Sequence, residues 1–389
     1  MGSTSRSVER RGQDDWVSAP IPILVMLVAL GGLILVSSSN WLSVYLAIEL
    51  STLALFVLAA QQRGSGRSVE AGLKYFVLGA LSSGLFLFGC ALICGQVGGA
   101  SISSGQLIYG VAKEGALPPL GCLLISVALL FKLATAPFHM WAPDVYDGAP
   151  TTTTALLAIV PKIAIFSILV SVGPLINMLL MGAVFSLIVG SLGALNQTKI
   201  KRLLAYSGIG HIGFILWGLE IGSFESIQAS LIYMIIYVIM SISAFSIVLS
   251  QGINSNYIVE FSGLSRSEPA LAVCLALTFL SMAGIPPLAG FIAKWLVLLS
   301  GVVLEYFVVA VLAVVCSVVA GIYYVRVVKI IYFQTDYPIL LAVKTLRREN
   351  LINFRKGMLI SISLFILVSL ITSPNLLLQC AHWATVGLF

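Results

Sequence analysis

Residues 120–171 read LGCLLISVALLFKLATAPFHMWAPDVYDGAPTTTTALLAIVPKIAIFSILVS. Two apolar runs, at about 119–137 and 151–171, are each long enough to cross the roughly 30 Å hydrocarbon layer of a membrane as a helix. The first run ends at Thr135-Ala136-Pro137-Phe138-His139, where proline removes an amide donor and interrupts the helical ladder. This stretch therefore predicts membrane helices, one of which is broken.

Apolar runs of this kind recur over almost the whole chain. Of its 389 residues, 59% are hydrophobic and 9% are charged, whereas soluble domains carry about 25% charged residues. A water-soluble enzyme is excluded, and we predict an all-α polytopic membrane protein.

The apolar runs predict about eleven transmembrane helices, with a polar tail before them at 1–20. After them, at 336–389, come a basic loop, the last transmembrane helix and a C-terminal tail. The predicted spans are about 22–39, 41–60, 72–97, 119–137, 151–171, 174–195, 203–220, 226–250, 269–302, 304–333 and 357–373. The ninth is too long for one crossing and is interrupted by Gly284-Ile285-Pro286-Pro287. Irregular backbone at membrane depth survives only where protein buries it or water reaches it, so both breaks indicate a functional site.

The first ten spans fall into two groups of five within a transmembrane domain at 21–335. The groups cover about 21–171 and 174–333, and the fourth helix of each is broken and carries a lysine near the break, Lys132 or Lys294. Because five crossings is an odd number, the second group inserts upside down relative to the first. Inverted repeats with broken helices at matching positions are typical of transporters.

The loop cations predict the orientation. In the eleven-span arrangement, fourteen Lys and Arg residues lie in the tail and in the loops on its side of the membrane, and Lys113 alone lies on the other side. Cationic loops face the cytoplasm or matrix. The N-terminus is therefore expected there, and the net charge of +6 reflects loops rather than a nucleic-acid-binding face.

Five ionisable residues lie well inside apolar runs. A charge at the middle of a membrane costs at least about 2.5 kcal/mol, and such residues usually pair or line a water path. Burial disfavours the charged form, so groups of this kind can take up and release protons, as a proton relay requires. The five residues are Glu49, Lys132, Lys162, His211 and Lys294.

Each of these residues also has a structural interpretation. The lysines beside the two breaks could extend to lipid headgroups, and Lys162 could satisfy carbonyls freed by Pro161. Glu49 and His211 could be hydrogen-bond partners in helix packing. His139, in the first break, could relay protons or cap a helix end.

Cofactor and metal motifs are absent from the sequence. The six cysteines show no C-x-x-C spacing, and there is no phosphate-binding loop, dinucleotide fingerprint or haem motif. Outside the spans, Glu70 and Lys74 are four residues apart and predict an ion pair on a helix surface. Asp144 and Asp147 predict a capping turn after the first break.

Three segments, 131–166, 196–214 and 283–295, resemble the antiporter-like membrane subunits of respiratory complex I, NADH:ubiquinone oxidoreductase. The likeness runs from about residue 20 to 335. PFHMWAPDVYDGAPT (137–151) is most similar to the subunit 2 type, called subunit N in bacteria. The resemblance implies that quinone reduction elsewhere drives alternating Glu–Lys pairing and moves protons through half-channels.

The resemblance also implies roles and surroundings. Glu49 and Lys132 would form the Glu–Lys couple, Lys162 would bridge, Lys294 would be the terminal lysine, and His211 would join the central hydrophilic axis. No cofactor would bind this chain, since FMN, iron–sulfur clusters and ubiquinone belong to the rest of the complex. Partners would be neighbouring antiporter-like and small membrane subunits, accessory subunits and lipids such as cardiolipin, with no nucleic acid.

The chain begins at what would be the fourth helix of the longer family members. Shortened forms are a mitochondrial pattern, so we expect the mitochondrial inner membrane with the N-terminus in the matrix, the alternative being a bacterial plasma membrane. Three other functions remain open at this point: a stand-alone or Mrp-type cation/proton antiporter, a plastid or cyanobacterial homologue coupled to ferredoxin, and a purely architectural subunit.

Overall fold

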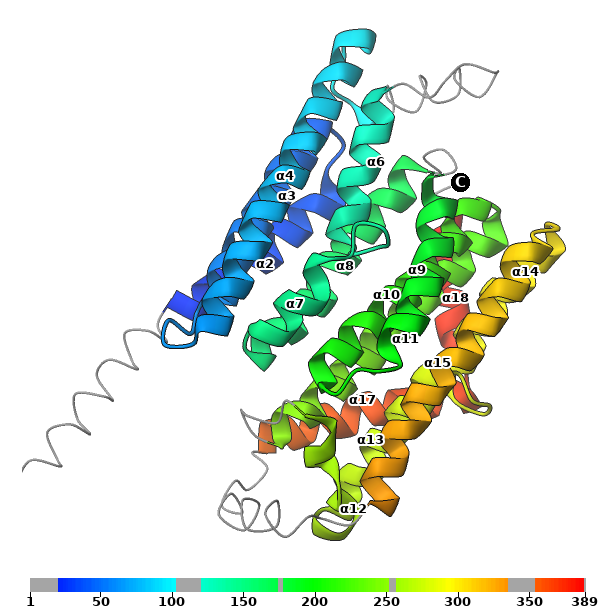
Figure 1. The fold of residues 1–389 in the computed structure, drawn as a ribbon. Coiled ribbons are helices and arrows are strands. Elements are labelled where there is room, and N and C mark those ends of the chain that lie inside the picture. The colour runs from blue at the N-terminus through cyan, green and yellow to red at the C-terminus, as the bar shows by residue number, and fades with distance from the viewer. Residues whose placement is uncertain (1–19, 103–119, 174–177, 252–256, 335–353, 388–389) are drawn as a thin grey trace, which may run out of the picture.

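A computed structural model describes residues 20–102, 120–173, 178–251, 257–334 and 354–387 of the chain. Within these ranges all regular elements are helices (Figure 1). The polar tail at 1–19, the loop that contains Lys113 and the basic segment at 335–353 lie outside the described residues.

The N-terminal half contributes six helices within its described residues. They are α2 (Pro20–Ser37), α3 (Trp41–Ala59), α4 (Gly66–Val97), α6 (Leu120–Lys132), α7 (Trp141–Gly148) and α8 (Thr151–Val172). The C-terminal half continues with α9 (Met178–Ala194), α10 (Ile200–Ile221), α11 (Phe224–Ser250), η1 (Ile258–Phe261), α12 (Leu264–Ser267), α13 (Pro269–Ala283), α14 (Ala289–Val303), α15 (Phe307–Phe333), α17 (Phe354–Thr372) and α18 (Asn375–Val386).

Seven helices in the described part of the chain are long and apolar enough to cross a membrane, or eight if α17 and α18 are counted as one bent span. α6, α9, α13 and α14 are shorter apolar helices. The outer helices expose large apolar side chains, such as Met26 (73%) and Leu33 (72%) on α2 and Val308 (82%) on α15. A soluble surface does not tolerate such patches, so the fold is that of an all-helical membrane protein.

The helices from α2 to α15 lie in successive groups across the bundle. In Figure 1, α2, α3 and α4 stand at one side, α6, α7 and α8 in the middle, and α13, α14 and α15 at the other side. α8 contacts both α2 and α11 and so joins the two halves. α9 and α10 pack closely because Gly190 has no side chain: a Cβ there would lie 2.5 Å from the Gly210 nitrogen.

The first break separates α6 from α7 at residues 133–140, which include Pro137. Its freed carbonyls find partners within the protein. The Thr135 hydroxyl donates to the Leu130 oxygen (2.9 Å), and the Trp141 indole donates to the Phe131 oxygen (2.9 Å). Protein groups thus satisfy these two carbonyls without water or lipid.

The second break separates α13 from α14 and contains Pro286 and Pro287. Gly284 ends α13 with a φ of 81°, which favours glycine. Lys294, from α14, donates to the Ala283 oxygen at 2.7 Å and so caps α13. The ammonium lies at the negative end of the α13 dipole.

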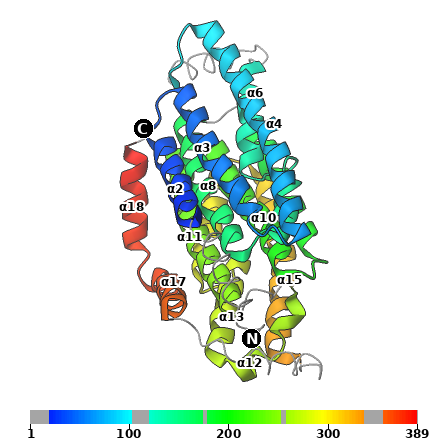
Figure 2. The same ribbon diagram turned by 90° about the vertical axis from the view of Figure 1, so that its left-hand side faces the viewer.

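The C-terminal segment bends sharply. α17 covers the expected span at 357–373, but it meets α18 at 86°. α17 is seen lengthwise in Figure 1 and nearly end-on in Figure 2, whereas α18 stands upright in Figure 2. Both pack against α11. α18 falls in the segment that the sequence predicted as a tail.

Candidate functional site

The five buried ionisable residues come from five different helices. Glu49 lies on α3, Lys132 ends α6, Lys162 lies on α8, His211 on α10 and Lys294 on α14. Figure 1 shows these helices in that order across the bundle. The three lysines and His211 are at most 7% exposed, and Glu49 is half-buried.

Glu49 and Lys132 lie within electrostatic range of each other. Glu49 Oε1 and Lys132 Nζ are both buried, and neither has a hydrogen-bond partner among the described residues. Among the ion pairs of the described residues there is none between Glu49 and Lys132. An unpartnered buried ammonium is costly, so this arrangement leaves Lys132 free to pair or to lose its proton.

Lys132 lines two small cavities. One, of about 10 Å³, is also lined by Ser51, Thr52 and Tyr75, which is close to the space that one water molecule needs. The other, which is too small for a water molecule, lies against two serines of α4. Side chains that carry hydroxyl groups therefore line the space beside Lys132.

Lys162 is fixed by a tyrosine from the second half. Its Nζ donates to the Tyr237 hydroxyl of α11 at 2.9 Å, and that hydroxyl faces the Ala158 oxygen at 3.5 Å. The ammonium also lies 5.1 Å from the centre of the Tyr237 ring. The recorded hydrogen bond of Lys162 thus goes to Tyr237 rather than to a carbonyl freed by Pro161.

His211 is held at both ring nitrogens. Nδ1 lies 2.9 Å from the Tyr233 hydroxyl of α11, and Nε2 lies 3.2 Å from the Tyr324 hydroxyl of α15. Lys162 and Lys294 both lie within electrostatic range of the imidazole. His211 is therefore an ionisable group between two lysines.

Lys294 is packed into the second break. Besides the Ala283 oxygen, its ammonium faces the Phe214 ring at 5.8 Å. A Cβ on Gly284 would lie 2.9 Å from its Cδ. A cavity of about 20 Å³, room for one water molecule, is lined by both Lys294 and His211. Lys294 consequently does not extend to a lipid headgroup.

His139 lies in the first break and is 7% exposed. Its Nδ1 is buried and has no hydrogen-bond partner within the described ranges, and its ring centre is 6.5 Å from that of Tyr206 on α10. The structure records no contact of His139 with the five other residues in the part it describes, and its role as a relay residue stays a prediction.

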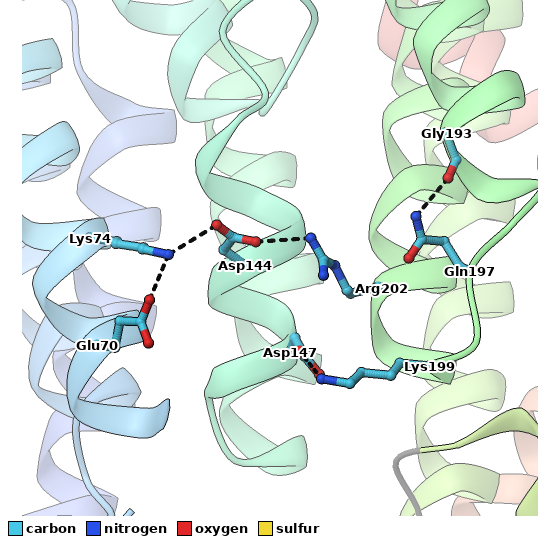
Figure 3. Close-up of polar contacts among 8 residues, drawn as sticks. All are labelled: Glu70, Lys74, Asp144, Asp147, Gly193, Gln197, Lys199 and Arg202. Carbon is cyan, nitrogen blue, oxygen red and sulfur yellow. Dashed lines mark hydrogen bonds and ion pairs between the residues drawn. The ribbon is translucent and has the colours of Figure 1, made fainter. Parts of the chain in front are cut away.

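A charged cluster joins α7 to α4 and α10 (Figure 3). Asp144 accepts from Lys74 and from Arg202, each at 3.1 Å, and Asp147 accepts from Lys199 at 2.5 Å. The predicted pair of Glu70 and Lys74 is present at 2.7 Å. The two aspartates bridge neighbouring helices, a wider role than the capping that the sequence indicated.

Sequence reasoning missed two sets of polar residues. Lys201, counted with the loop cations, is 5% exposed and donates to the Ala149 oxygen at 2.9 Å. Tyr233, Tyr237 and Tyr324, which bind His211 and Lys162, were not predicted. The sequence signal was weak, because a tyrosine in an apolar helix is an ordinary packing residue.

Comparison with known proteins first defines the class. The family model described as "NADH:quinone oxidoreductase/Mrp antiporter, TM" matches residues 38–320. The chain is thus an antiporter-like membrane protein, in agreement with its interrupted helices and buried lysines.

Individual relatives define the family more closely. NADH-ubiquinone oxidoreductase chain 2 of Metridium senile is 67% identical over 374 residues, which cover 95% of this chain and 97% of that protein. NADH-quinone oxidoreductase subunit N of Beijerinckia indica is 42% identical over 330 residues, covering 82% of this chain and 69% of that protein. The chain belongs to the chain 2 (subunit N) family of NADH–quinone oxidoreductase, which confirms the resemblance.

A solved structure agrees with this assignment. A chain of respiratory complex I from Thermus thermophilus, solved with bound aureothin, matches with a TM-score of 0.77 and 32% sequence identity. The match covers 92% of this chain and 79% of the other.

Proposed function

We propose that this chain is a proton-translocating subunit in the membrane arm of respiratory complex I. Protons would move through a buried relay formed by Glu49, Lys132, Lys162, His211 and Lys294, driven by quinone reduction elsewhere in the complex. The chain would act as a translocase subunit without a redox centre or cofactor of its own, and FMN, iron–sulfur clusters and ubiquinone would belong to other subunits.

One observation carries the proposal: a row of protonatable groups crosses the bundle interior, and its first two members are close but unpaired. Glu49 and Lys132 lie within electrostatic range without a direct ion pair among the described residues. Forming or breaking that pair would change whether Lys132 holds its proton, because a nearby opposite charge favours the ammonium and burial disfavours it. Lys162 and Lys294 act on His211 through the same electrostatic effect.

The finer architecture belongs to the same proposal. We infer about eleven spans arranged as two inverted five-helix repeats, a site in the mitochondrial inner membrane and an N-terminus in the matrix. The two interrupted helices, α6–α7 and α13–α14, each with a lysine near the break, support the repeat. Neighbouring antiporter-like and small membrane subunits, accessory subunits and lipids such as cardiolipin would surround the chain.

A stand-alone or Mrp-type antiporter is less well supported. The matched family model covers both classes, but the 67% identity is to a protein named as NADH-ubiquinone oxidoreductase chain 2. A purely architectural role would leave the cost of several buried ionisable groups without a use.

Substitution of Glu49 in the assembled complex tests the proposal. Glu49→Ala should assemble normally but lose proton pumping, because no carboxylate remains to alternate with Lys132. Glu49→Asp should keep part of it. The control is Glu70→Gln, which removes a carboxylate from the surface of α4, where the Glu70 side chain is 62% exposed. A complex with this substitution should pump normally.

Native gels report assembly, and NADH-driven proton uptake into liposomes that contain the purified complex reports pumping. Co-migration of the chain with NADH-dehydrogenase activity is expected. Migration with only a few small membrane proteins, or wild-type pumping by Glu49→Ala, would contradict the proposal. A protease-sensitive N-terminal tag should be cut from the matrix side, and cutting from the opposite side would contradict the orientation.

A further inference from the structure

His211 is bound by two tyrosine hydroxyls from two different helices. Tyr233 of α11 contacts Nδ1 at 2.9 Å, and Tyr324 of α15 contacts Nε2 at 3.2 Å. All three side chains are buried, Tyr233 and Tyr324 to 1% exposure and His211 to 5%. We refer to these residues as the Tyr–His–Tyr triad.

The triad can satisfy both charge states of the imidazole. A neutral imidazole has one N–H donor and one acceptor nitrogen, whereas an imidazolium has two donors. A hydroxyl can either donate or accept, so two hydroxyls pair with both nitrogens in either state. A buried charge without such partners is strongly disfavoured. The triad therefore allows His211 to gain and lose a proton where it lies.

The two tyrosines differ in their access to Lys294. The cavity of about 20 Å³ between α10, α14 and α15 is lined by His211, Lys294 and Tyr324. Tyr233 is not among the described residues that line it, and its ring stacks on Phe214 at 5.7 Å. Tyr324 is thus the hydroxyl that both contacts His211 and faces the space around Lys294.

We propose that Tyr324 is the relay residue between Lys294 and His211, and that Tyr233 is a positioning residue that accepts from the second imidazole N–H. This inference deepens the proposed function and depends on it. A proton leaves the Lys294 ammonium and binds the Tyr324 oxygen, directly or through one water molecule. The proton that Tyr324 already carried moves to the Nε2 lone pair of His211. One O–H bond forms as another breaks, so Lys294 becomes neutral, His211 becomes an imidazolium and Tyr324 is unchanged.

Phenylalanine substitutions test the triad, since they remove a hydroxyl and keep the ring. The chain-dependent share of proton uptake is defined as wild-type uptake minus that of Glu49→Ala. Tyr324→Phe should lower this share about tenfold or more, the effect of losing a hydrogen bond to a charged group. Tyr146→Phe is the matched control: Tyr146, on α7, is 2% exposed, and its hydroxyl has no hydrogen-bond partner among the described residues. It should pump within about twofold of wild type, as expected when no bond to the relay is lost.

The double variant separates a shared path from two independent defects. Tyr233→Phe should also lower the chain-dependent share, because the imidazolium loses one acceptor. Tyr233→Phe combined with Tyr324→Phe should pump no worse than Tyr324→Phe alone, since residues of one network are not additive. Native gels and NADH:quinone reductase activity show that each complex is assembled.

Three results would overturn the triad: wild-type uptake by Tyr324→Phe, an equal loss in Tyr146→Phe, or multiplied losses in the double variant. If Glu49→Ala loses uptake and Tyr324→Phe does not, the triad alone is wrong. If Glu49→Ala itself pumps like wild type, the proposed function and the triad are both wrong.

Discussion

Gly208 lies on α10, one turn before His211, beside the hydrogen bond between Lys162 and Tyr237. A Cβ at this position would lie 3.1 Å from Lys162 Nζ and 3.1 Å from the Tyr237 oxygen. Both distances are shorter than ordinary van der Waals contacts, so Gly208→Ala would push the ammonium and the hydroxyl out of the positions in which they bond at 2.9 Å. The perturbation is one methyl group placed against one polar contact.

Two opposing free energies decide the outcome. Replacing glycine by alanine inside a helix stabilises the fold by about 1 kcal/mol. Losing a hydrogen bond to a charged group costs about 1.5–3 kcal/mol. The folding free energy therefore changes by no more than about 2 kcal/mol, but the protonated form of Lys162 loses its recorded partner. We expect normal assembly with the chain-dependent share of proton uptake lowered about tenfold, since 1.4 kcal/mol corresponds to a factor of ten.

Gly210→Ala provides the matched control on the same helix. Its Cβ would meet the Gly190 backbone at 3.9 Å, an ordinary contact that involves no polar side chain. Native gels, NADH:quinone reductase activity and proton uptake into liposomes should show Gly210→Ala to be like wild type and Gly208→Ala to be slow only in proton uptake. Equal uptake by the two variants would refute the role given to the bond between Lys162 and Tyr237.

Two further pairs of variants test how the helices are held together. Asp144→Ala should lower the thermal melting temperature of the purified complex more than Glu70→Ala, because Asp144 binds both Lys74 and Arg202 whereas Glu70 binds Lys74. The effect should be small, since these side chains are 35–62% exposed to solvent that screens their charges, and equal melting temperatures would count against the cluster. Gly290→Ala should prevent assembly on native gels, because its Cβ would overlap the Ser281 carbonyl oxygen. Gly321→Ala, whose Cβ would meet no atom of the described residues within 4 Å, should assemble. An assembled Gly290→Ala complex would show that α13 and α14 can move apart.

The helix breaks could be predicted because their cause is local. A proline lacks the amide hydrogen wherever it stands, so Pro137, Pro286 and Pro287 indicate interruptions without knowledge of the neighbours. Buried ionisable residues are equally visible, since Lys132 or Lys294 stands out against twenty apolar residues. Both signals depend on composition within one segment.

The partners of those residues could not be predicted because they depend on packing between distant segments. Tyr237 is 75 residues from Lys162, and Tyr324 is 113 residues from His211. Lys201 stands next to other cations in the sequence and was counted with them, but α7 packs over it. The segment at 375–386 is too short and too polar for a span, so its helix was missed. α18 packs against α11 in the fold.

Two lysines of nearly equal burial allow the most direct test of proton relay through the buried residues. Lys132 is 6% exposed, and its Nζ has no hydrogen-bond partner among the described residues. Lys201 is 5% exposed, and its Nζ is bound to the Ala149 oxygen. Lys132→Met and Lys201→Met each remove one buried ammonium and keep most of the side-chain volume.

The measurement is the number of protons taken up per NADH oxidised by liposomes that contain each assembled complex. We predict that Lys132→Met loses the chain-dependent protons, and that Lys201→Met keeps them although its complex melts at a lower temperature. Undiminished proton uptake per NADH in an assembled Lys132→Met complex would contradict the relay.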